Sequence, residues 1–240
     1  MTSNQFFIDI LPDNEAIFFL EGQEHHHLSR VARVKPGDKV WLTDGRGWRL
    51  LAEVEEVQAS RTKLRPLQAV QENLETRVIL GLGLTRTDTF EFVVQKATEL
   101  GVAEIQPLLT RRSQRLPLDR LERKLRRWET IAREALKQCK GGLLPLIGGP
   151  LRLEDALSRK VEGLKFYLDE DSRHYFRDIL VSGRAGEVYL LVGPEGGWAE
   201  EEKEIMDRAG FQGLSLGCRV LRTETAVLAA LSLISHFWNW

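Results

Sequence analysis

The sequence of 240 residues has few of the features on which several classes of protein depend. Cysteine occurs only at Cys139 and Cys218, which argues against a disulfide framework and fits a reducing cytosol. The first fifteen residues have no basic stretch followed by a long apolar core, so no secretory signal is expected. The longest apolar run, Ala226 to Ile234, is too short to span a bilayer. We therefore expect a cytoplasmic protein that does not associate with membranes.

The chain also lacks a net charge of appreciable size, because its 34 Lys and Arg residues nearly balance 35 Asp and Glu residues. The length fits one large domain or two small ones. The overall balance hides a basic segment, Arg111 to Lys140, in which eleven Lys and Arg residues face four acidic ones. Helical pairs such as Glu122–Arg126 and Glu129–Arg133 would neutralise some of these charges. The remainder favours a surface that faces phosphate groups.

Short apolar runs separated by turns indicate β structure from residue 1 to about residue 70. Two runs, Lys39–Thr43 and Trp48–Val57, flank Asp44–Gly47, a sequence typical of a hairpin turn. A short helix is predicted at Glu24–Val34. Strands at this spacing suggest a small barrel. The segment Pro66–Thr76 has little periodicity and is interpreted as a linker.

From Arg77 onward, strands and helices alternate, which predicts a parallel α/β sheet. The predicted strands are Val78–Leu82, Ile105–Leu108, Phe166–Leu168, Val188–Val192 and Leu214–Leu216. The predicted helices are Phe90–Leu100, Leu118–Lys140, Glu200–Ala209 and Thr225–Trp238. Pro107 cannot donate to a central ladder, so its segment is interpreted as a strand or an edge segment. The last helix is apolar on nearly every face, and we expect it to be buried in the sheet packing or in a subunit interface.

Three motifs suggest other kinds of site and are rejected. Three consecutive histidines, His25–His27, point about 100° apart on a helix and do not converge on one ion, so we predict no metal and interpret them as solvent-facing. Gly81–Arg86 begins like a dinucleotide fingerprint but lacks the third glycine and the later acidic residue. Gly193–Gly197 is not a P-loop, because no Gly-Lys-Ser or Gly-Lys-Thr follows it.

Two glycine-containing loops near the C-terminus are the candidate ligand site. The first, Gly193–Gly197, joins an apolar strand to an acid-rich helix start. Its three glycines let the backbone approach a ligand, and the helix N-terminus offers free N–H groups. The second loop, Leu216–Thr225, precedes the last helix, for which Thr223 is a plausible N-cap.

The second loop also carries the charged residues Arg219, Arg222 and Glu224. A helix cap with a surface ion pair is the simpler interpretation. Two arginines before a buried helix are nevertheless costly unless they are paired or used. This cost favours a functional role for the cluster.

Taken together, LLVGPEGGW (190–198) and LSLGCRVLRTETA (214–226) resemble the RsmE-type ribosomal RNA methyltransferases of the SPOUT superfamily. Three other blocks are similar to that family, namely Phe90–Ser113, Arg127–Cys139 and His26–Asp38. The resemblance covers most of the chain. It departs mildly from the family pattern at Val31–Arg33, at Lys140–Gly142 and at Cys218.

The resemblance implies an α/β fold in which a small N-terminal PUA-like β-barrel, residues 1–72, binds RNA. A SPOUT methyltransferase domain with a trefoil knot, residues 73–240, would follow it. The family implies a homodimer, with the cofactor site near the subunit interface. The implied reaction is methyl transfer from S-adenosyl-L-methionine to N3 of a uridine in the 16S ribosomal RNA of the small ribosomal subunit.

The resemblance also assigns roles to individual residues. The expected cofactor-binding residues are Leu168, Gly193, Pro194, Glu195, Gly196, Gly197, Leu216, Gly217, Val220, Leu221 and Thr225. The expected catalytic residues are Arg219, Arg222 and Glu224, with the base and the anion-stabilising group left unassigned among them. The expected RNA-binding residues are Arg30, Arg33, Arg46, Arg86, Lys96, Arg111, Arg112 and Arg115. Two other readings are a SPOUT methyltransferase acting on transfer RNA or another ribosomal nucleotide, and a non-catalytic RNA-binding assembly factor.

Overall fold

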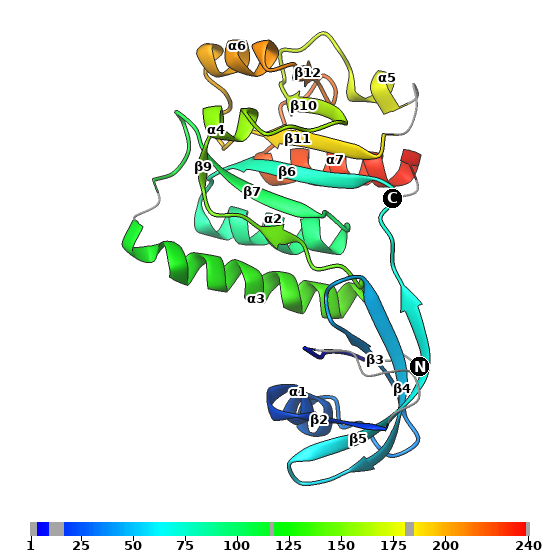
Figure 1. Ribbon diagram of the computed structural model, residues 1–240. Coiled ribbons are helices and arrows are strands. Elements are labelled where there is room, and N and C mark those ends of the chain that lie inside the picture. The colour runs from blue at the N-terminus through cyan, green and yellow to red at the C-terminus, as the bar shows by residue number, and fades with distance from the viewer. Residues whose placement is uncertain (1–3, 10–16, 116–117, 181–184, 239–240) are drawn as a thin grey trace. The chain divides into compact units, whose positions relative to one another are not determined.

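The computed structural model describes residues 4–9, 17–115, 118–180 and 185–238 (Figure 1). The chain divides into two compact units. The first unit comprises residues 1–73 and 133–144, and the second comprises residues 74–132 and 145–240. Each unit has its own β-sheet.

The first unit contains a five-stranded sheet with the order β1-β3-β4-β5-β2. Its strands are β1 (Gln5–Phe7), β2 (Phe18–Glu21), β3 (Lys39–Thr43), β4 (Trp48–Val57) and β5 (Arg61–Gln71). The pair β1–β3 is parallel and the other pairs are antiparallel. The predicted hairpin is confirmed, because β3 and β4 are antiparallel neighbours around the Asp44–Gly47 turn.

Alternation along the strands builds the core of the first unit. On β4, Leu50, Ala52 and Val54 are buried, and they belong to one apolar cluster with Leu42 and Leu28. Leu28 comes from the π-helical turn His27–Val31, which directly follows α1 (Gly22–His26). The helix predicted at Glu24–Val34 is therefore shorter and ends in a different geometry.

Two sequence interpretations in the first unit were wrong. His25 is buried rather than solvent-facing, and its Nδ1 lies 2.8 Å from the hydroxyl of Thr62, so it is a satisfied core histidine. The segment interpreted as a linker is partly strand, since β5 continues to Gln71. Pro66 is tolerated within β5 because it lies at the register shift in the β4–β5 pairing, where the ladder is already irregular.

The second unit is built on a parallel sheet with the order β12-β10-β11-β6-β7-β8, in which β9 also pairs with β7. Its strands are β6 (Arg77–Gly83), β7 (Glu104–Leu109), β8 (Leu146–Ile147), β9 (Leu151–Arg152), β10 (Leu164–Leu168), β11 (Glu187–Val192) and β12 (Gln212–Leu214). The predicted α/β fold is confirmed. The last strand ends at Leu214, two residues earlier than the end predicted at Leu216.

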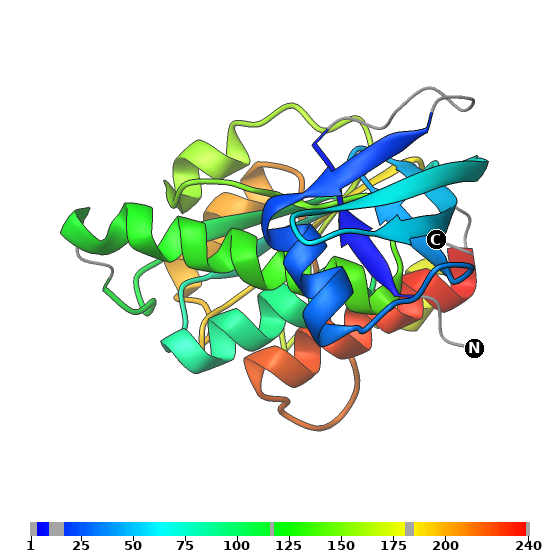
Figure 2. The ribbon, with the colours of Figure 1, turned by 90° about the horizontal axis from the view of Figure 1, so that it is seen from below.

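Helices cover the sheet of the second unit. They are α2 (Thr87–Glu99), α3 (Leu121–Cys139), α4 (Leu153–Leu157), α5 (Phe176–Leu180), α6 (Glu200–Arg208) and α7 (Thr223–Trp238). A 3-10 turn (Leu118–Arg120) precedes α3, and the last residues of α3 belong to the first unit. Helices α2 and α7 lie side by side (Figures 1 and 2). Side chains of α4 and α6 join a separate apolar cluster with Ile79, Tyr167 and Tyr189 of the strands.

Pro107 lies on an interior strand, which differs from the edge position that its missing N–H suggested. Strand β7 pairs with β6 on one side and with both β8 and β9 on the other. Strand β8 pairs with Glu104 and Ile105, and β9 pairs with Leu108 and Leu109. Pro107 therefore lies opposite the gap between two short strands, where no N–H donor is needed.

Helix α7 is buried along one stripe only. Val227, Ala230, Leu231, Ile234 and Trp238 are buried, whereas Phe237 is 47% exposed. The apolar residues outside the stripe lie at partly accessible positions, which differs from the all-round burial expected within the sheet packing. In the described residues, no helix is both long and apolar enough to cross a membrane.

Candidate functional site

Two adjoining pockets lie where the strands of the second unit end, at the place where open α/β sheets commonly bind ligands. The first pocket is lined by Leu168 at the end of β10, by Gly193, Pro194 and Gly197 of the first loop, and by Leu216, Gly217 and Leu221 of the second loop. It encloses about 530 Å³ of space, part of which is open to solvent. The structure thus brings the two glycine-containing loops together around one cavity.

The second pocket shares Pro194, Gly197, Leu221 and Thr223 with the first. Its wall carries more charged and polar side chains, namely Arg86, Arg112, Gln114, Glu170, Glu195, Arg222 and Glu224. The pair therefore consists of a cavity lined mainly by backbone and apolar groups and an adjoining cavity lined by charged groups.

The loop Gly193–Gly197 is held by contacts to other segments of the second unit. The N–H of Gly197 donates to the carbonyl oxygen of Pro194 at 2.9 Å, and Gly197 has a φ of +67°, a conformation that favours glycine. Glu195 accepts the backbone N–H of Arg86 at 3.0 Å. The guanidinium of Arg112 donates to the carbonyl oxygen of Gly196 at 2.8 Å. These bonds fix the course of the loop.

The end of β6 lies directly against this loop at Gly83. A Cβ at Gly83 would lie 2.6 Å from Pro194 Cδ and 2.7 Å from Pro194 N. Gly81, two residues earlier, would bring a Cβ to within 2.4 Å of the side chain of Leu191. The Gly81-x-Gly83 pattern, which begins like a dinucleotide fingerprint, therefore allows close packing of β6 against β11 and the loop.

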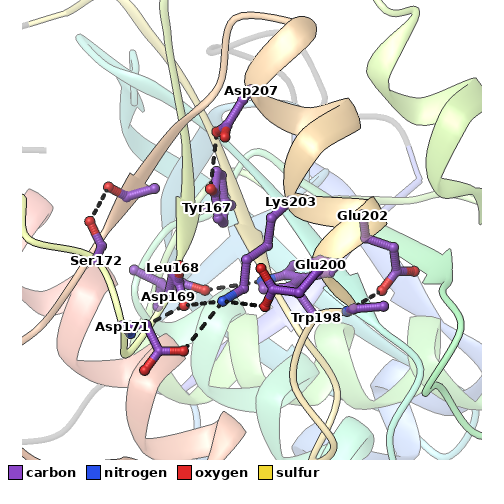
Figure 3. Close-up of polar contacts among 12 residues, drawn as sticks. Tyr167, Leu168, Asp169, Asp171, Ser172, Trp198, Glu200, Glu202, Lys203 and Asp207 are labelled. Carbon is purple, nitrogen blue, oxygen red and sulfur yellow. Dashed lines mark hydrogen bonds and ion pairs between the residues drawn. The ribbon is translucent and has the colours of Figure 1, made fainter.

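Two further contacts connect the loops with the strands. The indole N–H of Trp198 donates to the carbonyl oxygen of Leu168 at 3.0 Å (Figure 3). The hydroxyl of Thr223, the residue predicted as an N-cap, donates to the carbonyl oxygen of Gly193 at 3.2 Å and so joins the second loop to the first. Both side chains line the first pocket.

The start of α6 is stabilised by a buried carboxylate. Glu202 accepts the backbone N–H of Ala199 at 2.8 Å (Figure 3) and the backbone N–H of Arg111 at 2.8 Å. Its side chain is buried, so both bonds are shielded from water. One carboxylate thereby caps the helix that follows the first loop and holds the chain after β7.

An ion cluster borders the first pocket. The ammonium of Lys203 lies 3.0 Å from the Asp169 carboxylate and 3.4 Å from the carboxylates of both Asp171 and Glu200 (Figure 3). Burial lowers the pKa of Lys203, but the hydrogen bond and charge of Asp169, with help from Glu200, outweigh this effect and raise the pKa. Asp169 lines the pocket and is thus largely neutralised by its partner.

The residues expected to bind the cofactor converge on these cavities, with one exception. All of them except Thr225 line at least one of the two pockets. The pockets also include residues that the sequence did not single out, among them Asp169, Glu170, Trp198 and Gln114. Trp198 directly follows the first loop, which was the only signal for it. Asp169 and Glu170 follow the expected residue Leu168, whereas Gln114 comes from a segment distant from both loops.

The expected catalytic residues divide between the pockets. Arg222 and Glu224 line the second pocket and Arg219 lines the first. Both arginines are exposed, so the burial cost used to argue for their function does not apply. Arg222 and Glu224 make no ion pair within the described part of the chain. Their charges are therefore available to a ligand.

The expected RNA-binding residues are spread over both units. Arg30, Arg33 and Arg46 are exposed on the first unit. On the second unit, Arg86 and Arg112 line the second pocket, and Arg115 lines a neighbouring basic pocket. Lys96 and Arg111 line none of these three pockets. Lys96 pairs with Glu99, and Arg111 pairs with Glu201.

The basic segment from Arg111 to Lys140 is partly neutralised. The predicted pair Glu122–Arg126 forms at 3.3 Å. Arg133, the partner expected for Glu129, instead lies over the ring of Phe7 at 5.0 Å. Among the described residues, no group of three or more His, Cys, Asp or Glu side chains is arranged to hold a metal ion.

The chain matches two protein families along its length. Residues 20–66 match the RNA methyltransferase PUA domain, and residues 72–235 match the RNA methyltransferase domain. The second match contains the parallel sheet and both pockets. The fold and its site thus define an RNA methyltransferase.

Relatives and solved structures identify the family within the RNA methyltransferases. The chain is 32% identical to ribosomal RNA small subunit methyltransferase E of Synechocystis sp., over 92% of this chain and 73% of the relative. It is 31% identical to the protein of that name from Bacillus subtilis, over 97% of this chain and 96% of the relative. A crystal structure of ribosomal RNA small subunit methyltransferase E from Neisseria gonorrhoeae bound to S-adenosyl methionine is 29% identical, with a TM-score of 0.88 over 98% of each chain. The chain belongs to the family of ribosomal RNA small subunit methyltransferase E.

Proposed function

We propose that this protein transfers a methyl group from S-adenosyl-L-methionine to N3 of a uridine in the 16S RNA of the small ribosomal subunit. The observation that carries the proposal is the pair of adjoining pockets, one lined by both glycine-containing loops and the other carrying Arg222 and Glu224. The crystal structure of the relative from Neisseria gonorrhoeae, which is bound to S-adenosyl methionine, supports the choice of cofactor.

The first pocket fits the cofactor on chemical grounds. A Cβ at Gly197 or Gly217 would meet no protein atom within 4 Å, so free space adjoins the backbone of both loops. Leu168, Leu216 and Leu221 offer apolar surface for an adenine ring. The exposed carboxylate of Glu170, which lines both pockets, suits the positive charges of the amino group and the sulfonium. When bound, the cofactor supplies an electrophilic methyl group.

The second pocket would hold the target uridine. Its N3 carries a proton that must leave before the nitrogen can attack the methyl carbon, and the base then carries negative charge. The Glu224 carboxylate is suited to accept that proton, and the Arg222 guanidinium is suited to stabilise the anion. Arg219, at the first pocket, would hold a phosphate or the cofactor carboxylate. Because N3 lies on the Watson–Crick edge, the target must be unpaired or flipped out of its helix.

Glu224→Gln tests this division of roles. It keeps the size of the side chain and removes the proton acceptor. We expect methyl transfer to fall roughly 10²-fold or more, with binding of S-adenosyl-L-methionine unchanged. Ser232→Ala, at an exposed position of the same helix, is the control. An unaltered rate for Glu224→Gln would remove Glu224 from the mechanism.

The finer organisation belongs to the same proposal. Residues 1–72 would form a PUA-like β-barrel and residues 73–240 a SPOUT domain with a trefoil knot. In support of this proposal, β12 pairs with β10 rather than with β11, its predecessor, so the chain crosses back past β11 before the last helix. We further propose a homodimer, because Phe237 on α7 and Phe92 on the neighbouring α2 leave apolar surface exposed. The proposed substrate, ribosomal RNA, would place the protein in the cytoplasm.

The RNA would contact both units. Arg30, Arg33 and Arg46 would bind it on the first unit, and Arg86, Arg112 and Arg115 on the second, with Lys96 and Arg111 as outer contacts.

Substrates other than 16S RNA would need the same unpaired uridine. A pure assembly factor would bind RNA without the cofactor. Calorimetric titration with S-adenosyl-L-methionine distinguishes a methyltransferase from an assembly factor. Saturable binding supports the methyltransferase, and no binding even with ribosomal RNA present refutes it.

A further inference from the structure

A third cavity, which we call the basic pocket, adjoins the second pocket. It lies between the turn from β6 to α2, the segment Gln114–Arg115 and helix α3. It shares Arg86 and Gln114 with the second pocket. Whatever occupies it will therefore lie next to the ligand of the second pocket.

The basic pocket is rich in hydrogen-bond donors. Three cationic side chains line it, Arg86, Arg115 and Lys124, and none of the described residues in its lining is acidic. By contrast, the second pocket carries the three carboxylates of Glu170, Glu195 and Glu224. A donor-rich, positively charged wall without carboxylates suits a ligand that only accepts hydrogen bonds.

The cations are not fully neutralised within the protein. The Lys124 ammonium is held by the hydroxyl of Thr87 at 2.7 Å, a neutral partner that orients it and leaves its charge intact. Arg115 makes no ion pair with the described residues. Arg86 lies 3.5 Å from Glu195 and is the one cation of the three with an acidic partner there. The pocket thus keeps a positive charge.

The first turn of α2 and the side chain of Trp128 also border the basic pocket. Helix α2 begins at Thr87, and its N-cap residue Arg86 offers no side-chain cap, so the first N–H groups of the helix favour an anion. Trp128 is 1% exposed and lines the pocket, and its buried indole N–H has no hydrogen-bond partner among the described residues. Because that nitrogen has almost no accessible surface, Trp128 serves as a spectroscopic reporter at the wall of the pocket rather than as a direct donor.

We propose that the basic pocket binds a phosphate group of the RNA, at a nucleotide adjacent to the methylated one, and so positions the target base in the second pocket. The inference rests on the proposed function. Lys124 is the new member of the RNA site. It acts as a positioning residue, because it touches a flanking phosphate rather than the reacting atoms.

The test compares Lys124→Gln with Arg123→Gln. Arg123 is the preceding residue on α3, is exposed, does not line the pocket, and gives the same change in net charge. For Lys124→Gln we expect the KM for small-subunit RNA to rise roughly five- to tenfold with kcat little changed. The slope of log binding constant against log salt should fall by about 0.7–0.9, the value for one phosphate. Arg123→Gln should match the parent in both.

Nuclear magnetic resonance of the indole N–H groups identifies the ligand. The Trp128 signal is assigned with Trp128→Phe. Uridylyl-uridine, which has one internucleotide phosphate, should shift this signal in the parent and not in Lys124→Gln. Uridine without phosphate should leave the signal unmoved. A signal that shifts with inorganic phosphate but not with uridylyl-uridine would mean a site for a free anion and would overturn the assignment to RNA.

Equal KM values for Lys124→Gln and Arg123→Gln would also overturn the proposal. The parent distinguishes this failure from failure of the proposed function. If the parent methylates RNA and Lys124→Gln behaves as Arg123→Gln does, only the phosphate site is wrong. If the parent transfers no methyl group at all, the proposed function is wrong.

Discussion

Gly83→Ala should displace the Gly193–Gly197 loop of the proposed cofactor site, because residue 83 at the end of β6 lies against that loop, and it should leave the fold in place. The new Cβ would lie 2.7 Å from Pro194 N and 2.6 Å from Pro194 Cδ, whereas ordinary contact begins at 3.4 Å. The loop must therefore retreat by about 0.7–0.8 Å, because the opposing atoms belong to backbone and a proline ring and cannot rotate away. Overpacking of this kind costs about 1–3 kcal/mol.

The functional effect should exceed the effect on stability. The displaced loop lines both pockets, and a misplacement near 1 Å can cost roughly 10²-fold in rate. We expect the Kd for S-adenosyl-L-methionine to rise at least about tenfold and methyl transfer to fall by about 10- to 100-fold. Calorimetric titration measures the first, and transfer of a tritiated methyl group to small-subunit RNA measures the second.

Gly149→Ala is the matched control for this experiment. A Cβ at Gly149 would meet nothing within 4 Å, and its backbone is not in the left-handed region. This variant should bind and react as the parent does. Parental cofactor affinity in a folded Gly83→Ala protein would refute the claim that the Gly193–Gly197 loop holds the cofactor.

Two other substitutions test how the scaffold is stabilised. Glu202→Gln should lower the free energy of unfolding by about 2–4 kcal/mol, because the amide cannot accept both buried N–H groups that the carboxylate accepts; parental stability in urea unfolding would contradict this. Burial raises the pKa of Tyr189 to about 12, so its stabilising contribution is complete below pH 10 and is lost as the pH rises through about 12, by about 3 kcal/mol in all. Tyr189→Phe should remove that alkaline loss and cost little at pH 7, since the buried hydroxyl has no partner among the described residues, whereas unfolding profiles that coincide from pH 8 to 12 would argue against the assignment.

Much of the second unit could be predicted from the sequence because its signals are local. Apolar runs such as Val188–Val192 become buried strands, and the glycines after them become loops that line a pocket. The prolines were harder to place. Pro107 on an interior strand and Pro66 within β5 depend on what lies opposite them, a gap between short strands and a register shift, and neither can be seen in the sequence.

The parts of the site that the sequence did not predict depend on contacts between distant segments. Trp198 contacts Leu168, and Thr223 contacts Gly193, 30 residues away in each case. Gly83 was noticed only as part of an incomplete dinucleotide motif, although its role is to admit the loop that follows β11. Periodicity describes one segment at a time, so it cannot reveal such pairs.

Nucleoside analysis by mass spectrometry is the most direct test of the account. Small ribosomal subunits that lack the modification are incubated with the protein and S-adenosyl-L-methionine, and the RNA is then digested to nucleosides. The account predicts 3-methyluridine, formed only when the cofactor is present. Another methylated nucleoside, or none from a protein that binds the cofactor, would contradict the proposed reaction.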